Sequence, residues 1–151
     1  MPLTPETTAV IEAGRQQIRV ETEALADVLD QIDERFVRVA SLLQSMTGKV
    51  VMTGSGTSGF IARRSAHLVS VSGTPAFFLN PGDGLHGSMG AVEGDDVMIA
   101  LSKGGSSSEL NDLVARVKDV GTRVVALTAN AASPLGELAD ITVEIRNYPA
   151  A

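Results

Sequence analysis

Residues 50–60, VVMTGSGTSGF, place three glycines directly after an apolar, β-branched run and before a helical pattern. This order is typical of a loop at the carboxyl end of a parallel strand, where open α/β sheets bind their ligands. A second loop of the same kind, SKGGSSSE at 102–109, also follows an apolar run and precedes a helical pattern. Glycine lets the backbone approach a ligand, and the first N–H groups of a helix are unpaired. Both loops are therefore candidate anion sites.

The segments around these loops predict alternating strands and helices. The expected strands are Val50–Thr53, Ala76–Leu79, Asp96–Leu101, Val124–Thr128 and Ile141–Ile145, and the expected helices are Ala62–Val71, Leu110–Val120 and Leu135–Leu138. Such alternation predicts right-handed crossovers, and the continuous apolar runs predict strands buried on both faces. The predicted fold class is α/β, a three-layer αβα sandwich around a five-stranded parallel sheet.

Ahead of the sheet, apolar residues recur every seven positions from Ile11 to Val39, which predicts one amphipathic helix or two helices in series. Thr4, Pro5 and Glu6 fit the start of a helix. The stripe would extend roughly 50 Å, so it packs either on the rest of the domain or on a second chain. We expect an N-terminal helical segment at 1–47 and an α/β core at 48–151, within one domain overall.

Composition narrows the function further. The 151 residues carry a net charge of −6 and include no cysteine and no tryptophan, which excludes thiol chemistry and disfavours nucleic acid and anionic membranes as partners. No apolar run reaches the ~18 residues that span a bilayer, and the polar start MPLTPETT lacks the order of a signal peptide. We expect a cytoplasmic protein without a cofactor or a metal site.

Three interpretations of the two loops differ in what they require. A dinucleotide site needs an acidic residue at the end of the second strand, but Asn80 and Pro81 stand there. A phosphorylated small molecule held between the loops uses both of them. The loops could also be tight turns with helix caps, without a ligand.

Four segments carry a family resemblance, in the order GSGTSGFIARRSAHLVSVSGTPAFFLNP, GLHGSMGAVEGDDVMIALSKGGSSSEL, VGTRVVALTAN and SPLGELADITVEI. Together they resemble the sugar isomerase (SIS) domain, most closely its arabinose 5-phosphate isomerase branch, over about residues 45–146. The resemblance implies a flavodoxin-like or Rossmann-like SIS fold, a homodimer or homotetramer, and a sugar phosphate as ligand. The resemblance is less specific for the reaction than for the fold, because relatives include other phosphosugar isomerases, aminosugar enzymes and sugar-sensing regulators.

The same resemblance implies a set of site residues. Ser102, Ser107 and Ser108 match the hydroxyls of a phosphate loop, and Gly73 with Thr74 matches a substrate-contacting pair. The full set expected to contact the ligand is Gly56, Thr57, Ser58, Gly73, Thr74, Ser102, Ser106, Ser107 and Ser108.

Aldose–ketose isomerisation through a cis-enediol(ate) needs a base, proton transfer between oxygens and stabilisation of an oxyanion. The resemblance assigns proton transfer to His86, in a glycine-rich loop, and to Glu109. Either residue also has a structural interpretation, His86 in the loop itself and Glu109 as the first-turn acid of a capped helix. His67, inside a predicted helix, is expected to pack or cap.

Three departures from the family pattern leave a second function open. Thr57 stands where many arabinose-phosphate isomerases have a lysine, although Lys103 in the neighbouring loop could supply the charge. Asn80 replaces a histidine linked to zinc binding, and the sequence stops at Ala151, ahead of a further acid and of CBS modules. The expected function is therefore a phosphosugar isomerase, or alternatively a non-catalytic sugar-phosphate-binding module. An assembly protein with vestigial loops is a third class.

Overall fold

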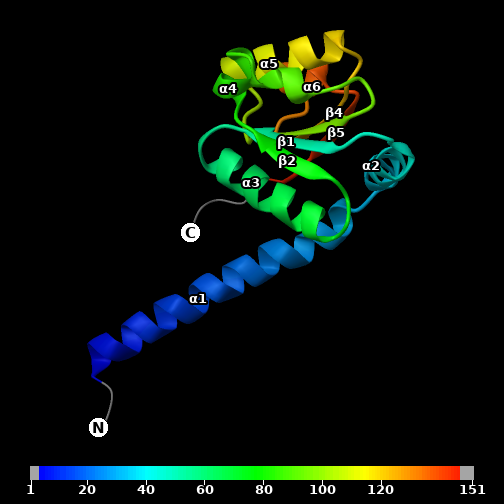
Figure 1. The fold of residues 1–151 in the computed structure, drawn as a ribbon. Coiled ribbons are helices and arrows are strands. Elements are labelled where there is room, and N and C mark those ends of the chain that lie inside the picture. Colours follow the sequence, from blue (N-terminus) through cyan, green and yellow to red (C-terminus); the bar gives the residue numbers. More distant parts are fainter. Residues whose placement is uncertain (1–3, 147–151) are drawn as a thin grey trace. The chain divides into compact units, whose positions relative to one another are not determined.

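The computed structural model describes residues 4–146, which fall into two compact units: residues up to Asp33, and Glu34–Arg146. The second unit contains a single sheet whose five strands all run parallel (Figure 1). In spatial order the strands are β2 (Ala76–Leu79), β1 (Val50–Gly54), β3 (Val97–Leu101), β4 (Arg123–Thr128) and β5 (Ile141–Glu144). The predicted five-stranded parallel sheet is confirmed.

Helices cover both faces of this sheet. One face carries α2 (Glu34–Ser45) and α3 (Gly56–Val71), and the other carries α4 (Pro81–Leu85), α5 (Ser108–Asp119) and α6 (Pro134–Leu138) (Figure 1). The predicted helices are all present, although α3 begins six residues earlier than expected, inside the glycine loop. The contacts group α2 with the α/β unit, whereas the predicted division at residue 48 placed it in the N-terminal segment; that division stays a prediction.

Alternate residues along each strand face opposite layers. On β1, Val51 packs with Leu110 and Leu113 of α5, while Val50 and Met52 pack toward α2 and α3. All three β1 residues are at least nine-tenths buried. Burial on both faces explains why the strands read as continuous apolar runs.

The segment between β2 and β3 contains two short helices that were not predicted, α4 and the 3₁₀ helix η2 (Ser88–Ala91). The side chain of Asn80 starts α4 by accepting a hydrogen bond from the N–H of Asp83 at 3.3 Å, and Pro81 occupies the first helical position. Four glycines within residues 81–91 removed the apolar periodicity on which the prediction relied.

The N-terminal unit consists of α1 (Pro5–Asp27) and the 3₁₀ helix η1 (Val28–Gln31). The Oγ1 of Thr4 accepts a hydrogen bond from the N–H of Thr7, which confirms the predicted helix start. The apolar stripe is not one helix, because η1 separates α1 from α2. No residue of α1 is buried within this chain. Among the helices of residues 4–146, none is both long and apolar enough to span a membrane.

Two aspartates fasten the amino-terminal edge of the sheet. Asp96, just before β3, accepts hydrogen bonds from the backbone N–H groups of Lys49 and Glu93, each at 2.8 Å, and pairs with the Lys49 ammonium at 2.9 Å. Asp140, just before β5, does the same with the N–H of Val124 at 2.7 Å and the Lys118 ammonium at 3.0 Å. Each aspartate thus ties its own strand to its neighbour.

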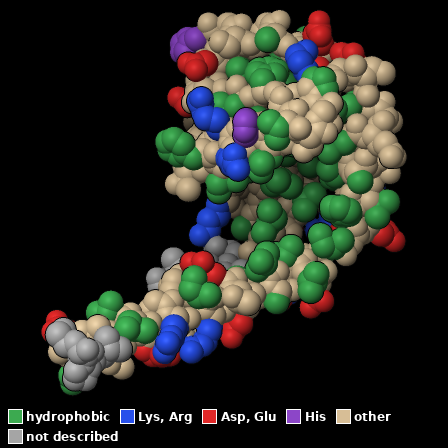
Figure 2. All heavy atoms as spheres, turned by 60° about the horizontal axis from the view of Figure 1, so that its bottom comes forward, with side chains coloured by type: hydrophobic (Ala, Val, Ile, Leu, Met, Phe, Trp, Pro, Cys, Tyr) green, Lys and Arg blue, Asp and Glu red, His purple; other side chains and the backbone are tan. Residues whose placement is uncertain are grey.

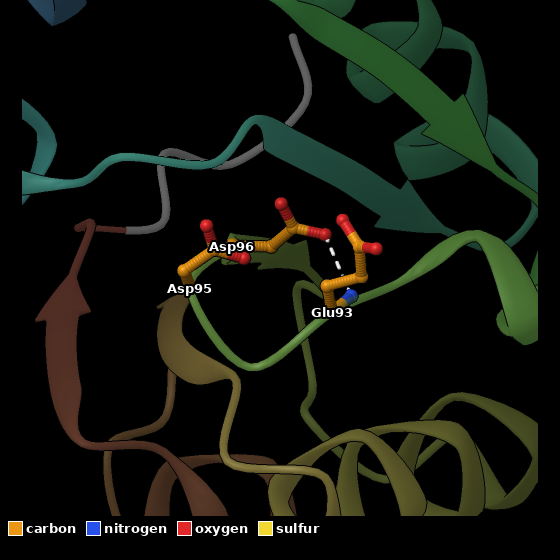
Figure 3. Close-up of side chains that lie close together, drawn as sticks. All are labelled: Glu93, Asp95 and Asp96. Carbon is orange, nitrogen blue, oxygen red and sulfur yellow. Dashed lines mark hydrogen bonds between the residues drawn. The ribbon is translucent and has the colours of Figure 1, made fainter.

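Glu93, Asp95 and Asp96 lie close together, with carboxylate oxygens within 4.8 Å of one another (Figure 3). This spacing alone would suit a cation. The Lys49 ammonium already pairs with two of the three groups, with Glu93 at 3.2 Å and with Asp96 at 2.9 Å. Asp95 accepts a hydrogen bond from the hydroxyl of Thr47 at 3.3 Å. The cluster is therefore explained as a strand-fastening device.

Asp96→Asn tests this role of the buried carboxylate. Burial raises the pKa of Asp96, but the hydrogen bonds from Glu93 and Lys49 outweigh it and hold the pKa below its ordinary 3.8. Because the folded-state pKa is lowered, the carboxylate stabilises the fold above pH 3.8 and loses this effect as the pH falls through the folded-state pKa. We expect Asp96→Asn to lower the free energy of unfolding by about 3 kcal/mol at pH 7.

The control is the exposed neighbour, Asp95→Asn, for which we expect a change within about 0.5 kcal/mol. Urea unfolding at pH 7 and at successively lower pH values measures both variants. The difference between wild type and Asp96→Asn should shrink on acidification. A constant difference at all pH values would contradict the ionic role.

Candidate functional site

The carboxyl end of β1 lies where the strand order reverses. The chain passes from β1 to β2 on one side, then returns across β1 to β3 on the other. Gly54 at the end of β1 is paired with Leu101 at the end of β3, so the loops after these strands start side by side. In open α/β sheets this switch point is where ligands bind.

The first loop is a single residue, Ser55, because α3 begins at Gly56. A Cβ on Gly59 would come within 2.6 Å of the carbonyl oxygen of Gly54, and one on Gly54 within 2.9 Å of the carbonyl oxygen of Leu101. Close packing therefore requires both glycines. Gly56 has φ of +55° and open space around it, so its backbone can face a ligand.

The second loop is held by its own hydrogen bonds. The Oγ of Ser102 accepts from the N–H of Gly105 at 3.1 Å, and the hydroxyl of Ser106 donates to the carbonyl of Gly104 at 3.2 Å. The carbonyl of Gly105 accepts from the N–H of Leu135 at 3.1 Å. The hydroxyl hydrogen of Ser102 is still available to a ligand, whereas that of Ser106 is engaged within the loop.

Ser107 and Ser108 stand at the start of α5. Ser107 is the N-cap residue, but its side chain makes no capping hydrogen bond. Within residues 4–146, no side-chain hydrogen bond involves Ser107, Ser108, Thr57 or Ser58. The first N–H groups of α3 and α5 have no intrahelical acceptor either. Glu109 is exposed in the first turn of α5. The edge thus offers several free donors to an anion.

A cleft of about 230 Å³ opens beside the first loop. It is lined by Gly54, Gly56, Gly59, Phe60, Arg63, Phe78 and Asn80. The guanidinium of Arg63 lies over the ring of Phe78, with 4.6 Å between the guanidinium carbon and the ring centroid. Among residues 4–146, no acidic side chain lines this cleft. Of the residues predicted to contact the ligand, Gly56 is the one that lines it.

Three predicted site residues are not part of the two loops. His86 ends α4 with an exposed side chain, and no hydrogen bond or ion pair within residues 4–146 connects its imidazole to Glu109. Gly73 and Thr74 lie between α3 and the first residue of β2, at the opposite edge of the sheet from the switch point. Gly73, with φ of +95°, ends α3. A single chain therefore does not bring this pair to the loops.

Comparison with known proteins identifies the family from which these features come. The model of the SIS domain matches residues 43–151. This chain belongs to the SIS domain family. Arabinose 5-phosphate isomerase GutQ of Escherichia coli strain K12 is 37% identical over 145 residues, which cover 93% of this chain and 45% of that protein. Arabinose 5-phosphate isomerase KdsD of Pseudomonas aeruginosa is 34% identical over 134 residues, covering 89% and 41%.

A solved structure of an E. coli CFT073 protein in complex with A5P has the same SIS fold. Its TM-score is 0.89 at 32% identity, and the match covers 97% of this chain and 77% of that one. The present SIS chain spans less than half the length of the two curated isomerases it matches.

Arg63 and Phe78 line the cleft of this SIS chain, although neither was predicted as a site residue. Gly56, Gly59 and Arg63 are spaced three and four residues apart, which puts them on one face of a helix. Phe78 and Asn80 are two residues apart, so they share one face of β2 and its continuation. This signal was present, but the predicted helix began at Ala62, which separated Arg63 from the glycines.

Within the described residues, two buried polar side-chain atoms near the switch point have no hydrogen-bond partner. These are Oγ1 of Thr53, near the end of β1, and Oδ1 of Asn111 in α5. The amide nitrogen of Asn111 donates to the carbonyl of Gly105 at 3.2 Å, so this side chain links α5 to the second loop. Unsatisfied buried groups are uncommon in stable cores and tend to occur near functional sites.

Gly105→Ala tests whether the second loop requires its observed backbone. Gly105 has φ of +66°, and a Cβ there would collide with the side chain of Ser133. We expect a loss of about 2 kcal/mol or more in the free energy of unfolding, measured in urea. Gly104→Ala is the matched control, since nothing lies within 4 Å of its Cβ position. Equal effects of the two substitutions would contradict the assigned loop geometry.

Proposed function

We propose that this SIS protein is a sugar-phosphate aldose–ketose isomerase that holds the phosphate in loop 102–108. The observation that carries the proposal is the pair of adjacent loops at the switch point, with the free hydroxyls of Ser107 and Ser108 beside the free N–H groups of α5. A phosphate dianion accepts hydrogen bonds from several such donors and is favoured at the positive end of a helix. The similarity to two arabinose 5-phosphate isomerases supports a pentose phosphate as the ligand.

The reaction requires two coupled proton movements. A base removes the proton on C2 of the open-chain aldose, and the electrons of that C–H bond form the C1=C2 bond of the enediolate as the carbonyl oxygen O1 gains negative charge. O1 takes up a proton, the O2 hydroxyl loses one to become the ketone, and C1 is protonated. His86 and Glu109 are the proposed proton carriers, because imidazole and carboxylate exchange protons near neutral pH when suitably placed.

The alternative function is sugar-phosphate binding without turnover. The absence of any hydrogen bond between His86 and Glu109 in the described chain favours this alternative. Incubation in deuterated water separates the two functions. An isomerase incorporates deuterium from solvent into arabinose 5-phosphate or its ketose, whereas a binding module is stabilised by the ligand and exchanges nothing.

Ser107→Ala and Ser108→Ala test the phosphate loop. A lost hydrogen bond to a charged oxygen costs about 1.5–3 kcal/mol, so each variant should bind sugar phosphate roughly 10–100-fold more weakly. Isothermal titration against a panel of pentose, hexulose and heptose phosphates measures this loss. Ser106→Ala is the internal comparison, with a smaller loss expected because its hydroxyl donates to Gly104. Unchanged affinity in the first two variants would contradict the loop assignment.

We also expect the protein to form a homodimer or homotetramer. The α1 helix leaves Ile18 63% and Leu25 71% exposed, and Figure 2 shows further hydrophobic side chains along it. An apolar groove of about 470 Å³ continues this surface, lined by Thr22, Leu25, Ala26, Val28, Leu29 and Ile32. Contact with a second copy would remove this apolar surface from water.

Introducing glutamate at both Ile18 and Leu25 tests the self-association. The paired substitutions should convert the oligomer to monomer in sedimentation velocity, because two charges would be buried in an apolar contact. Ala13→Glu adds the same charge on the other side of α1 and should leave the oligomer intact. A wild-type protein that sediments as a monomer at micromolar concentration would contradict the expectation.

A further inference from the structure

Arg63 is a cation without a counter-ion in the cleft beside the first loop. Within residues 4–146 no carboxylate pairs with it. None of the other residues that line the cleft is charged. In a chain with a net charge of −6, an unpaired guanidinium in an acid-free cleft is suited to an anionic or partly anionic ligand.

The guanidinium of Arg63 lies over the ring of Phe78, with 4.6 Å between the guanidinium carbon and the ring centroid. A cation over an aromatic face is attracted to the ring, and the guanidinium N–H groups can donate to ligand oxygens. Asn80 adds a second donor to the same cleft. Its Oδ1 already accepts from the N–H of Asp83, and its amide nitrogen has no partner in the described chain.

The cleft and the serine loop (residues 102–108) adjoin at the ends of β1 and β3. Gly54 lines the cleft and is paired with Leu101, the residue that precedes the serine loop. A ligand that crosses the end of β1 from the cleft would therefore meet the first residues of the serine loop. The free hydroxyls of Ser107 and Ser108 suit the phosphate, which leaves Arg63 for the other end of the molecule.

We propose that Arg63 binds the sugar end of the substrate and stabilises the oxyanion that forms there, while loop 102–108 holds the phosphate. This inference rests on the proposed isomerase function. In this proposal Arg63 stabilises the developing negative charge, and His86 and Glu109 carry the protons. It supplies a positive charge in a site where Thr57 has none.

Arg63→Met removes the charge with little change in side-chain volume. Arg63→Lys keeps the charge but loses the planar set of N–H donors of the guanidinium. With arabinose 5-phosphate as substrate, we expect Arg63→Met to lower kcat/KM by 100–1,000-fold, with the larger part in kcat. Arg63→Lys should recover part of the loss. Affinity for inorganic phosphate, which probes the serine loop alone, should stay within twofold of wild type in both variants.

Arg64→Met is the matched control, because Arg64 is the next residue of α3, exposed and outside the cleft. It should keep kcat/KM within twofold. If the wild type binds sugar phosphate without turning it over, the variants are compared by their Kd for the sugar phosphate instead of by kcat/KM. Arg63→Met should then lose at least tenfold in affinity for the sugar phosphate and nothing for inorganic phosphate. Thermal melts establish that each variant is folded, and Arg63→Lys carries the test if Arg63→Met is not.

The possible failures are distinguishable. Normal sugar-phosphate turnover or binding by Arg63→Met overturns the role of Arg63 and leaves the proposed function standing. A loss of inorganic phosphate affinity would place the guanidinium at the phosphate and overturn the assignment to the sugar end. A wild-type protein that binds no sugar phosphate of the panel overturns both proposals.

Discussion

The backbone contact between the first turn of α3 and the end of β1 leaves no room for a side chain. Gly59 sits against the carbonyl of Gly54, and Gly54 sits against the carbonyl of Leu101 on β3. This contact starts α3 immediately beyond β1, so that its first N–H groups lie at the switch point. It also sets which face of α3 borders the cleft, and Arg63 lies on that face two turns along the helix. A bulkier residue at either glycine would displace all of these groups together.

In the serine loop, some polar groups form hydrogen bonds within the loop and others remain free to donate to a ligand. The hydroxyls of Ser102 and Ser106 bond to the loop itself, and Asn111 supports it from α5. The hydroxyls of Ser107 and Ser108 have no partner within residues 4–146. A loop already fixed by its own hydrogen bonds pays little conformational entropy when an anion arrives, because the donors need no rearrangement.

Periodicity and turn chemistry were sufficient to predict the strands, the parallel sheet and the two loops. The strands are short apolar runs bounded by glycine and polar residues, and this signal is local. The short helix at Asn80 was missed because its glycines carry no apolar period. Asp96 was predicted as the first residue of a strand, yet its side chain fastens two strands through Lys49, a partner 47 residues away in sequence. The contact of Arg63 with Phe78 likewise depends on how a helix and a strand meet, which no local pattern records.

The groups that fasten this sheet and the groups that face a ligand lie at opposite ends of the strands. Asp96 and Asp140 tie the strands together at the amino edge, while the serine loop and the glycine loop follow the carboxyl ends of β3 and β1. Substitutions that retune ligand preference can therefore accumulate at one rim without weakening the ties at the other. Such a separation makes the α/β unit a tolerant scaffold for divergence, in which residues at the carboxyl rim can change while the strands stay fastened at the other end.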